Sequence, residues 1–83
     1  MTQREKTLQQ ILRGKADANI RFDDLRSLLL SLGFSERSRG SHRVFSKYGI
    51  EDQIILQPDG SKAKPYQVRQ VRSVLVKYNL AKD

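Results

Sequence analysis

The stretch that decides the fold is Phe22-Asp23-Asp24-Leu25-Arg26-Ser27-Leu28-Leu29-Leu30-Ser31-Leu32-Gly33. Its apolar residues at positions 22, 25, 28, 29 and 32 fall on one side of a helix, because residues three or four apart are neighbours there. Asp23 and Asp24 suit the positive end of the helix dipole, and Gly33 can adopt the left-handed conformation that ends a helix. The spacing predicts an amphipathic helix over 22–32 whose apolar face must be buried.

Two further helices are predicted. Leu8, Ile11 and Leu12 give a short apolar face to a helix over 5–13, and a loop follows over 14–19. This helix is too short to be stable alone, so we expect it to dock on the rest of the domain or on a partner. Pro65 suits the first turn of a last helix, whose apolar face repeats the spacing at positions 68, 71, 74, 75 and 78.

Three strands are predicted between the second and the last helix, over 34–38, 41–47 and 51–57. Arg39-Gly40 is expected to turn or bulge the chain after the first strand, Tyr48-Gly49 after the second, and Pro58-Asp59-Gly60-Ser61 after the third. Consecutive apolar residues leave the two faces of the third strand unassigned. The order helix, helix, three antiparallel strands, helix predicts a two-layer α+β domain, with helices on one sheet face and the other open to solvent or a ligand.

The length of 83 residues predicts a single domain over 1–83. The chain has no cysteine, which excludes disulfides and thiolate metal sites. No apolar run approaches the roughly 20 residues that span a bilayer. Residues 1–6 lack the apolar stretch of a signal peptide, so the cytoplasm is the expected location and no membrane partner is expected.

The positive charge is concentrated in the second half of the chain. The net charge is +7, and residues 37–83 hold ten of the 16 Lys and Arg residues but four of the nine Asp and Glu residues. Small basic domains usually bind nucleic acid or an acidic protein. The charge predicts a polyanionic partner for this half.

The single histidine, His42, lies in a cationic strip that contains Arg37, Arg39, Arg43 and Lys47 and no acid. Histidine can give and take protons near neutral pH. A proton-transfer group among cations indicates a protein that acts chemically on a phosphodiester. The alternative is a solvent-exposed histidine without a role, on a charged strand that deters aggregation.

A second cationic group follows the third strand. No acid lies between Asp59 and Asp83, and we expect RNA contacts from Lys62, Lys64, Arg69 and Arg72. An ordinary solvated helix face is the alternative. Tyr48 and Tyr66 are candidates for stacking on bases, whereas Tyr78 shares the apolar helix face and is expected in the core.

Four short motifs resemble the HicA family of toxin mRNA interferases, small basic proteins with a fold like the double-stranded RNA-binding domain. The matching residues are Leu29-Leu30-Ser31-Leu32-Gly33-Phe34, Arg39-Gly40-Ser41-His42, Leu56-Gln57-Pro58 and Val68-Arg69-Gln70-Val71. The resemblance covers roughly residues 20–80 and leaves 1–19 as an N-terminal helix and loop.

The resemblance implies an endoribonuclease that cleaves mRNA and is neutralised by a HicB-like antitoxin, with His42 as the catalytic residue. Such chemistry needs no metal or cofactor: neutral His42 takes the proton of a ribose 2′-OH, and Arg39, Arg43 or Lys47 stabilises the phosphorane. Ser41, in the same motif, is also expected to contact RNA. Many family members carry a second histidine where this chain has Arg43 or Asp59-Gly60, so a two-histidine scheme is not available here.

Two alternatives share these features. One is an RNA-binding module without catalysis on the same fold, and the other is a protein-interaction domain whose basic surface docks on an acidic partner. Salt-dependent RNA binding distinguishes the RNA-directed functions from the protein-interaction domain. RNA cleavage distinguishes an enzyme from the RNA-binding module. An antitoxin is expected to cover His42 and the strip over 37–47.

Overall fold

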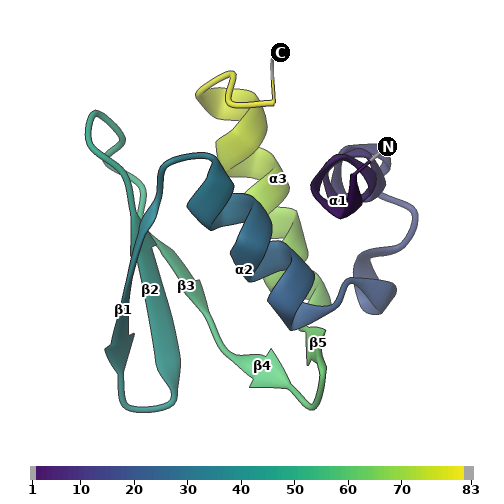
Figure 1. Ribbon diagram of the computed structural model, residues 1–83, viewed down its shortest axis with the longest axis horizontal. Coiled ribbons are helices and arrows are strands. Elements are labelled where there is room, and N and C mark those ends of the chain that lie inside the picture. The colour runs from purple at the N-terminus through teal and green to yellow at the C-terminus, as the bar shows by residue number, and fades with distance from the viewer. Residues whose placement is uncertain (1, 82–83) are drawn as a thin grey trace.

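The computed structural model describes residues 2–81 and has the α+β order predicted from the sequence (Figure 1). Its helices are α1 (Gln3–Arg13), α2 (Phe22–Ser31) and α3 (Pro65–Lys77), with a short 3₁₀ turn η1 (Asp17–Asn19). The antiparallel sheet has the order β1-β2-β3 and consists of β1 (Ser35–Arg39), β2 (His42–Ser46) and β3 (Ile54–Leu56). A separate hairpin pairs β4 (Pro58–Asp59) with β5 (Lys62–Ala63). Within residues 2–81, no helix has the length and apolar character to cross a membrane.

Helix α1 begins at Gln3, two residues before the predicted start at Glu5, because the chain forms a capping box. The Thr2 hydroxyl accepts a hydrogen bond from the Glu5 backbone N–H at 3.1 Å, and the Glu5 carboxylate accepts one from the Thr2 N–H at 3.3 Å. Two otherwise unpaired N–H groups are thereby satisfied.

Helix α2 ends as its sequence predicts. Gly33 adopts φ +95° and donates to the carbonyl of Leu30 at 3.1 Å, while Phe34 donates to the carbonyl of Leu29 at 3.1 Å. This pair of bonds is the Schellman motif, which satisfies the last helix carbonyls and turns the chain sharply. The turn directs the chain from α2 into β1.

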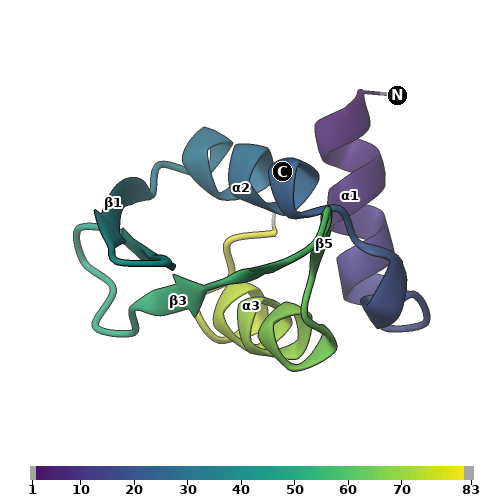
Figure 2. The same cartoon turned by 90° about the horizontal axis from the view of Figure 1, so that it is seen from below.

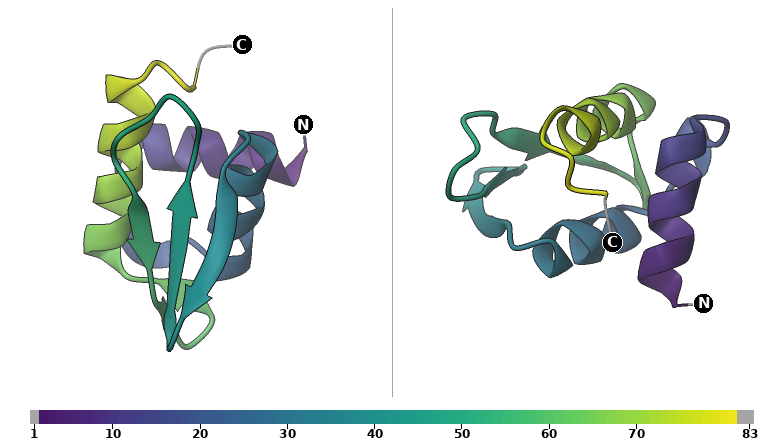
Figure 3. Two further views of the ribbon diagram at one scale, coloured as in Figure 1. Left: turned by 90° about the vertical axis from the view of Figure 1, so that its left-hand side faces the viewer. Right: turned by 90° about the horizontal axis from the view of Figure 1, so that it is seen from above.

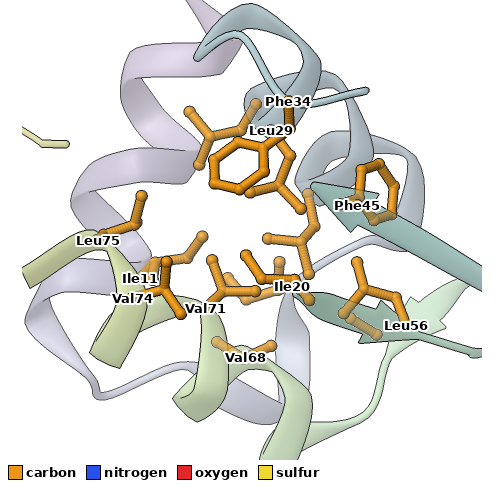
Figure 4. Close-up of a cluster of buried hydrophobic side chains, with 14 of the residues drawn as sticks. Ile11, Ile20, Leu29, Phe34, Phe45, Leu56, Val68, Val71, Val74 and Leu75 are labelled. Atoms are coloured by element: carbon orange, nitrogen blue, oxygen red, sulfur yellow. The ribbon is translucent and has the colours of Figure 1, made fainter. Parts of the chain in front are cut away.

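The core lies between the sheet and the helix pair α2 and α3 (Figures 2 and 4). The predicted apolar residues of both helices are buried, except Leu32 and Tyr78, which directly follow α2 and α3 and are half-buried. Phe45 of β2 and the ends of β3 face the helices. Helix α1 packs on α2 and α3 from the side away from the sheet and contributes Ile11. Tyr78 packs against this core as predicted. All three helices therefore lie on the same side of the sheet, and the other sheet face is open (Figure 3).

The third strand and the segment after it differ from the prediction. Residues 54–56 alone pair with β2, whereas a strand over 51–57 was expected. Pro58-Asp59-Gly60-Ser61 does turn the chain, but its first two residues also pair with β5. Strands of two residues show no periodicity. This hairpin is held instead by backbone bonds to the chain before α2, such as Ala63 N–H to the Ile20 carbonyl at 2.9 Å.

A buried amide joins α3 to the sheet. The Gln67 side chain is 3% exposed, and its Oε1 accepts a hydrogen bond from the backbone N–H of Gln57 at 3.2 Å. Gln57 directly follows β3, so its N–H would lose its acceptor if Gln67 were replaced by an apolar residue. This hydrogen bond is part-buried, and a backbone N–H that is withdrawn from water without an acceptor costs free energy.

We predict that Gln67→Met lowers the free energy of unfolding by about 1–2 kcal/mol, because methionine fills the space but cannot accept from Gln57. Chemical denaturation measures the change. The matched control is Gln70→Met at an exposed position of α3, which should change stability by less than about 0.5 kcal/mol. Equal effects of the two substitutions would contradict the role of this hydrogen bond.

Candidate functional site

The alternation of side chains along the strands divides the sheet residues between its two faces. Phe45 and Ile54 face each other in register and belong to the core, so their neighbours Val44 and Ile55 point to the open face. Val44 is 2% exposed yet lies outside the core cluster, which agrees with this placement. Arg37 pairs directly with Val44, so Arg37, Val44 and Ile55 form one row across the open face.

The next row holds His42. In β1 and β2, Arg39 is the direct partner of His42, and the two-residue turn Gly40-Ser41 connects them. Gly40 has φ +59°, whereas the φ of Ser41 is not positive, as in the hairpin turn that favours glycine at its first central position. Directly paired residues have Cβ atoms about 5 Å apart. The turn therefore holds the imidazole and one guanidinium side by side at the end of the hairpin.

A hollow of about 340 Å³ lies on this face, and its lining residues are Arg39, His42, Val44 and Ile55. Two of them supply apolar surface and two supply groups that bind or protonate an anion. The outward strand positions of β1 and β2 are completed by Arg37, Ser35 and Ser46, so none carries a carboxylate. The open face is therefore cationic, with an apolar floor.

The one carboxylate within β1 and β2, that of Glu36, points to the other face. Glu36 pairs in register with Phe45, and both of its carboxylate oxygens accept from Nε of Arg26, at 2.8 and 2.9 Å. This pair ties α2 to β1. It also holds the Glu36 carboxylate on the inner face, away from His42. Glu36 therefore does not neutralise the positive charge of the open face.

Arg43 was expected beside the reacting phosphate, but it lies on the opposite face from His42. Its register partners are Ser38 and Leu56, and its guanidinium donates to the Ser38 hydroxyl at 3.0 Å and lies 3.8 Å from the Glu36 carboxylate. Adjacent residues of a strand point in opposite directions. Proximity in sequence therefore misled the prediction for Arg43.

Lys47 was also expected near His42, and the structure places it elsewhere. Its ammonium reaches Gly33, where an added Cβ would lie only 2.5 Å from Nζ. Gly33 follows the C-terminus of α2, whose carbonyls favour a positive charge. Lys47 is five positions along the chain from His42, a distance of about 16 Å at 3.3 Å per residue of extended chain. Lys47 is thus removed from the candidate site.

The second predicted cationic group is not on the open face. Lys62 lies in β5, where its ammonium donates to the Asn19 side chain at 3.3 Å, and Lys64 is the residue before α3. Arg69 lies on α3, which covers the inner face of the sheet, and it contributes to lowering the pKa of Asp17. The turns β1–β2 and β4–β5 lie at the same end of the molecule (Figures 1 and 3). Lys62 and Lys64 are therefore near this end, while His42 faces the open side.

Arg72 was predicted to contact RNA, but its guanidinium is used within the fold. It donates to the Ile11 carbonyl at 2.8 Å and to both carboxylate oxygens of Asp17 at 2.9 Å. The Arg72 side chain is 23% exposed. These bonds tie α3 to the end of α1 and to η1, so Arg72 lies outside the hollow around His42 and its guanidinium already has partners within the fold.

The hydrogen bonds from Arg72 lower the pKa of Asp17 below its usual value. A carboxyl group with a lower pKa in the folded state stabilises the fold above the pKa of the unfolded chain, about 3.9, and this contribution is lost as the pH falls through the folded value. We predict that Asp17→Asn destabilises the protein at pH 7 and that the difference from wild type shrinks toward pH 3. Urea denaturation at both pH values measures it.

Asp59→Asn is the control for this prediction, because Asp59 is exposed in β4. It should change stability little at either pH. A loss for Asp17→Asn that is the same at pH 7 and pH 3 would contradict the ion pair as its cause.

Tyr48 and Tyr66, the predicted stacking residues, are both exposed but lie outside the hollow. Tyr48 lies in the loop between β2 and β3, and Tyr66 in the first turn of α3. The apolar lining residues Val44 and Ile55 were not predicted as part of a site. The three consecutive apolar residues of β3 show no alternation, so the sequence alone does not show which of them face outward. The pairing of β3 with β2 is needed to decide this.

Among residues 2–81, no three His, Cys, Asp or Glu side chains gather in an arrangement that could hold a metal ion. In comparisons with known proteins, no family model, no curated protein and no solved structure matched the chain.

Proposed function

We propose that the protein is a metal-independent endoribonuclease of the HicA type, with His42 as its catalytic residue. The observation that carries this proposal is the pairing of His42 with Arg39 on an open, cationic sheet face without a carboxylate at its outward strand positions. An RNA phosphodiester offers the negative charge that such a face attracts and the proton that an imidazole can move. The short motif around residues 39–42, which resembles that family, supports the same reading.

In this mechanism, neutral His42 removes the proton of a ribose 2′-OH, and the resulting oxygen attacks the adjacent phosphorus. Arg39, directly beside His42, stabilises the charge on the phosphorane, and Arg37 in the next row holds a neighbouring phosphate. The P–O5′ bond breaks to leave a 2′,3′-cyclic phosphate, and water supplies the proton to the leaving 5′ oxygen. Ser41, exposed in the turn, hydrogen-bonds the backbone of the RNA.

We further propose mRNA in the cytoplasm as the substrate and a HicB-like antitoxin as the protein partner, as the resemblance implies. Such a partner would inhibit cleavage by covering the open face around His42. Lys62, Lys64 and Arg69 would contact phosphates beyond the cleaved linkage, since the β4–β5 turn lies at the same end as the β1–β2 turn.

A second candidate function is RNA binding without cleavage. It is favoured by the hollow itself, where His42 is the only imidazole and no carboxylate lines the surface that could serve as a second acid. On this account Arg37 and Arg39 would still bind RNA, and replacement of His42 would alter affinity alone.

We predict that the wild-type protein cleaves labelled RNA with EDTA present and that His42→Ala does not, while its salt-dependent RNA binding persists. Arg39→Gln should lower the cleavage rate about 10–100-fold, because a donor to the phosphorane is lost. Arg43→Gln is the matched control on the opposite sheet face and should stay within about twofold of wild type. Gel analysis of a labelled oligoribonucleotide measures all four proteins.

Equal cleavage by wild type and His42→Ala would remove His42 from the mechanism. Binding without cleavage by either protein would favour the second candidate function. If Arg43→Gln is impaired as strongly as Arg39→Gln, the assignment of the reaction to the open face is wrong.

A further inference from the structure

We propose that the hollow on the open face holds one unpaired nucleotide, with its base against Ile55 and its ribose beside His42, so that the substrate is single-stranded RNA. This inference rests on the proposed function, whose site it shares. It assigns a ligand-binding role to the exposed apolar residue Ile55 and selects between single-stranded and duplex substrates.

The apolar part of the hollow is the first argument. Ile55 is 44% exposed, and it lies next to Val44 in register on the face that no helix covers. The outward positions of β1 are all serine or arginine, so the apolar patch is bordered by polar side chains on this side. A flat base placed on Ile55 removes apolar surface of the base and of this side chain from water, which favours binding.

The charges around this patch indicate what else the ligand must carry. Arg39 lies directly across from His42 and lines the hollow, and Arg37 lies directly across from Val44 in the next row, so two arginines occupy outward positions of β1 beside the hollow. Arginine binds phosphate through a planar pair of donors. A ligand with a flat apolar ring and a phosphate about one sugar away matches this arrangement, and a nucleotide is such a ligand.

The size of the hollow is the second argument for a single nucleotide. Its volume of about 340 Å³ is at the small end of pockets that hold small ligands. In an RNA duplex the bases are stacked and paired, the major groove is too narrow for side chains, and the minor groove offers 2′-OH groups and base edges. The flat side of a base can reach Ile55 only when the nucleotide is unpaired.

The test uses His42→Ala protein, so that RNA stays intact, and a fluorescent 12-nucleotide RNA, either alone or annealed to its complement. We expect the single strand to bind at least fivefold more tightly than the duplex. Adding Ile55→Ser should weaken single-strand binding about 5–20-fold and leave duplex binding unchanged. Leu12→Ser is the matched control, because Leu12 is 40% exposed on α1, away from the sheet.

A second variant keeps the test informative if Ile55→Ser disturbs the fold. Ile55→Tyr adds a ring on which a base can stack and should strengthen single-strand binding about threefold or more. Circular dichroism confirms that each variant is folded.

Tighter binding of the duplex, or no effect of either Ile55 variant, would overturn the inference. Absence of RNA binding in any form would also overturn it and would leave the face to a protein partner. Cleavage assays of the same Ile55 variants with His42 intact separate the two proposals. Cleavage by wild type that is insensitive to Ile55 contradicts only this inference, whereas selective single-strand binding without cleavage contradicts only the proposed enzymatic function.

Discussion

The rest of the structure depends on the burial of one sheet face under α2 and α3. Phe45 and Ile54 must face these helices, and strand alternation then sends His42, Val44 and Ile55 to the other side. A shift of one residue in this register would exchange the two sets. The same apolar pattern that forms the core thus determines which residues can meet a ligand.

This constraint also sorts the charges of the chain. On the inner side, cations are engaged within the fold: Arg26 with Glu36, and Arg72 with Asp17 and the end of α1. On the open face, the outward strand positions hold Arg37 and Arg39 without a carboxylate at any of them. The positions of the charged residues therefore say more about a binding surface than the net charge of the chain does. An arginine that binds both oxygens of a carboxylate stabilises the fold. Two arginines without a carboxylate beside them, next to an imidazole, are suited to binding a phosphodiester.

The helices could be predicted because their apolar spacing is continuous and their caps are local, as at Gly33. The site was predicted in part. Arg39 and Arg43 were both expected beside His42 because they are close to it in sequence. The turn was expected at Arg39-Gly40, but it is formed by Gly40-Ser41, so Arg39 belongs to β1 and pairs with His42, whereas Arg43 points the opposite way. The role of Arg72 depends on Asp17, 55 residues away, and such a contact leaves no local signal. Ile55 was missed because its face is decided only by pairing with Val44.

The most direct measurement of this account is NMR titration of the protein with a 2′-O-methyl oligoribonucleotide, which cannot be cleaved. The two adjacent isoleucine methyl groups report on the two faces, since Ile55 points outward and Ile54 lies in the core. The account predicts large shifts for the Ile55 methyl group, the His42 ring and the Arg39 guanidinium, with little change at Ile54. Shifts confined to Lys62, Lys64 and Arg69, with the open face unchanged, would contradict it.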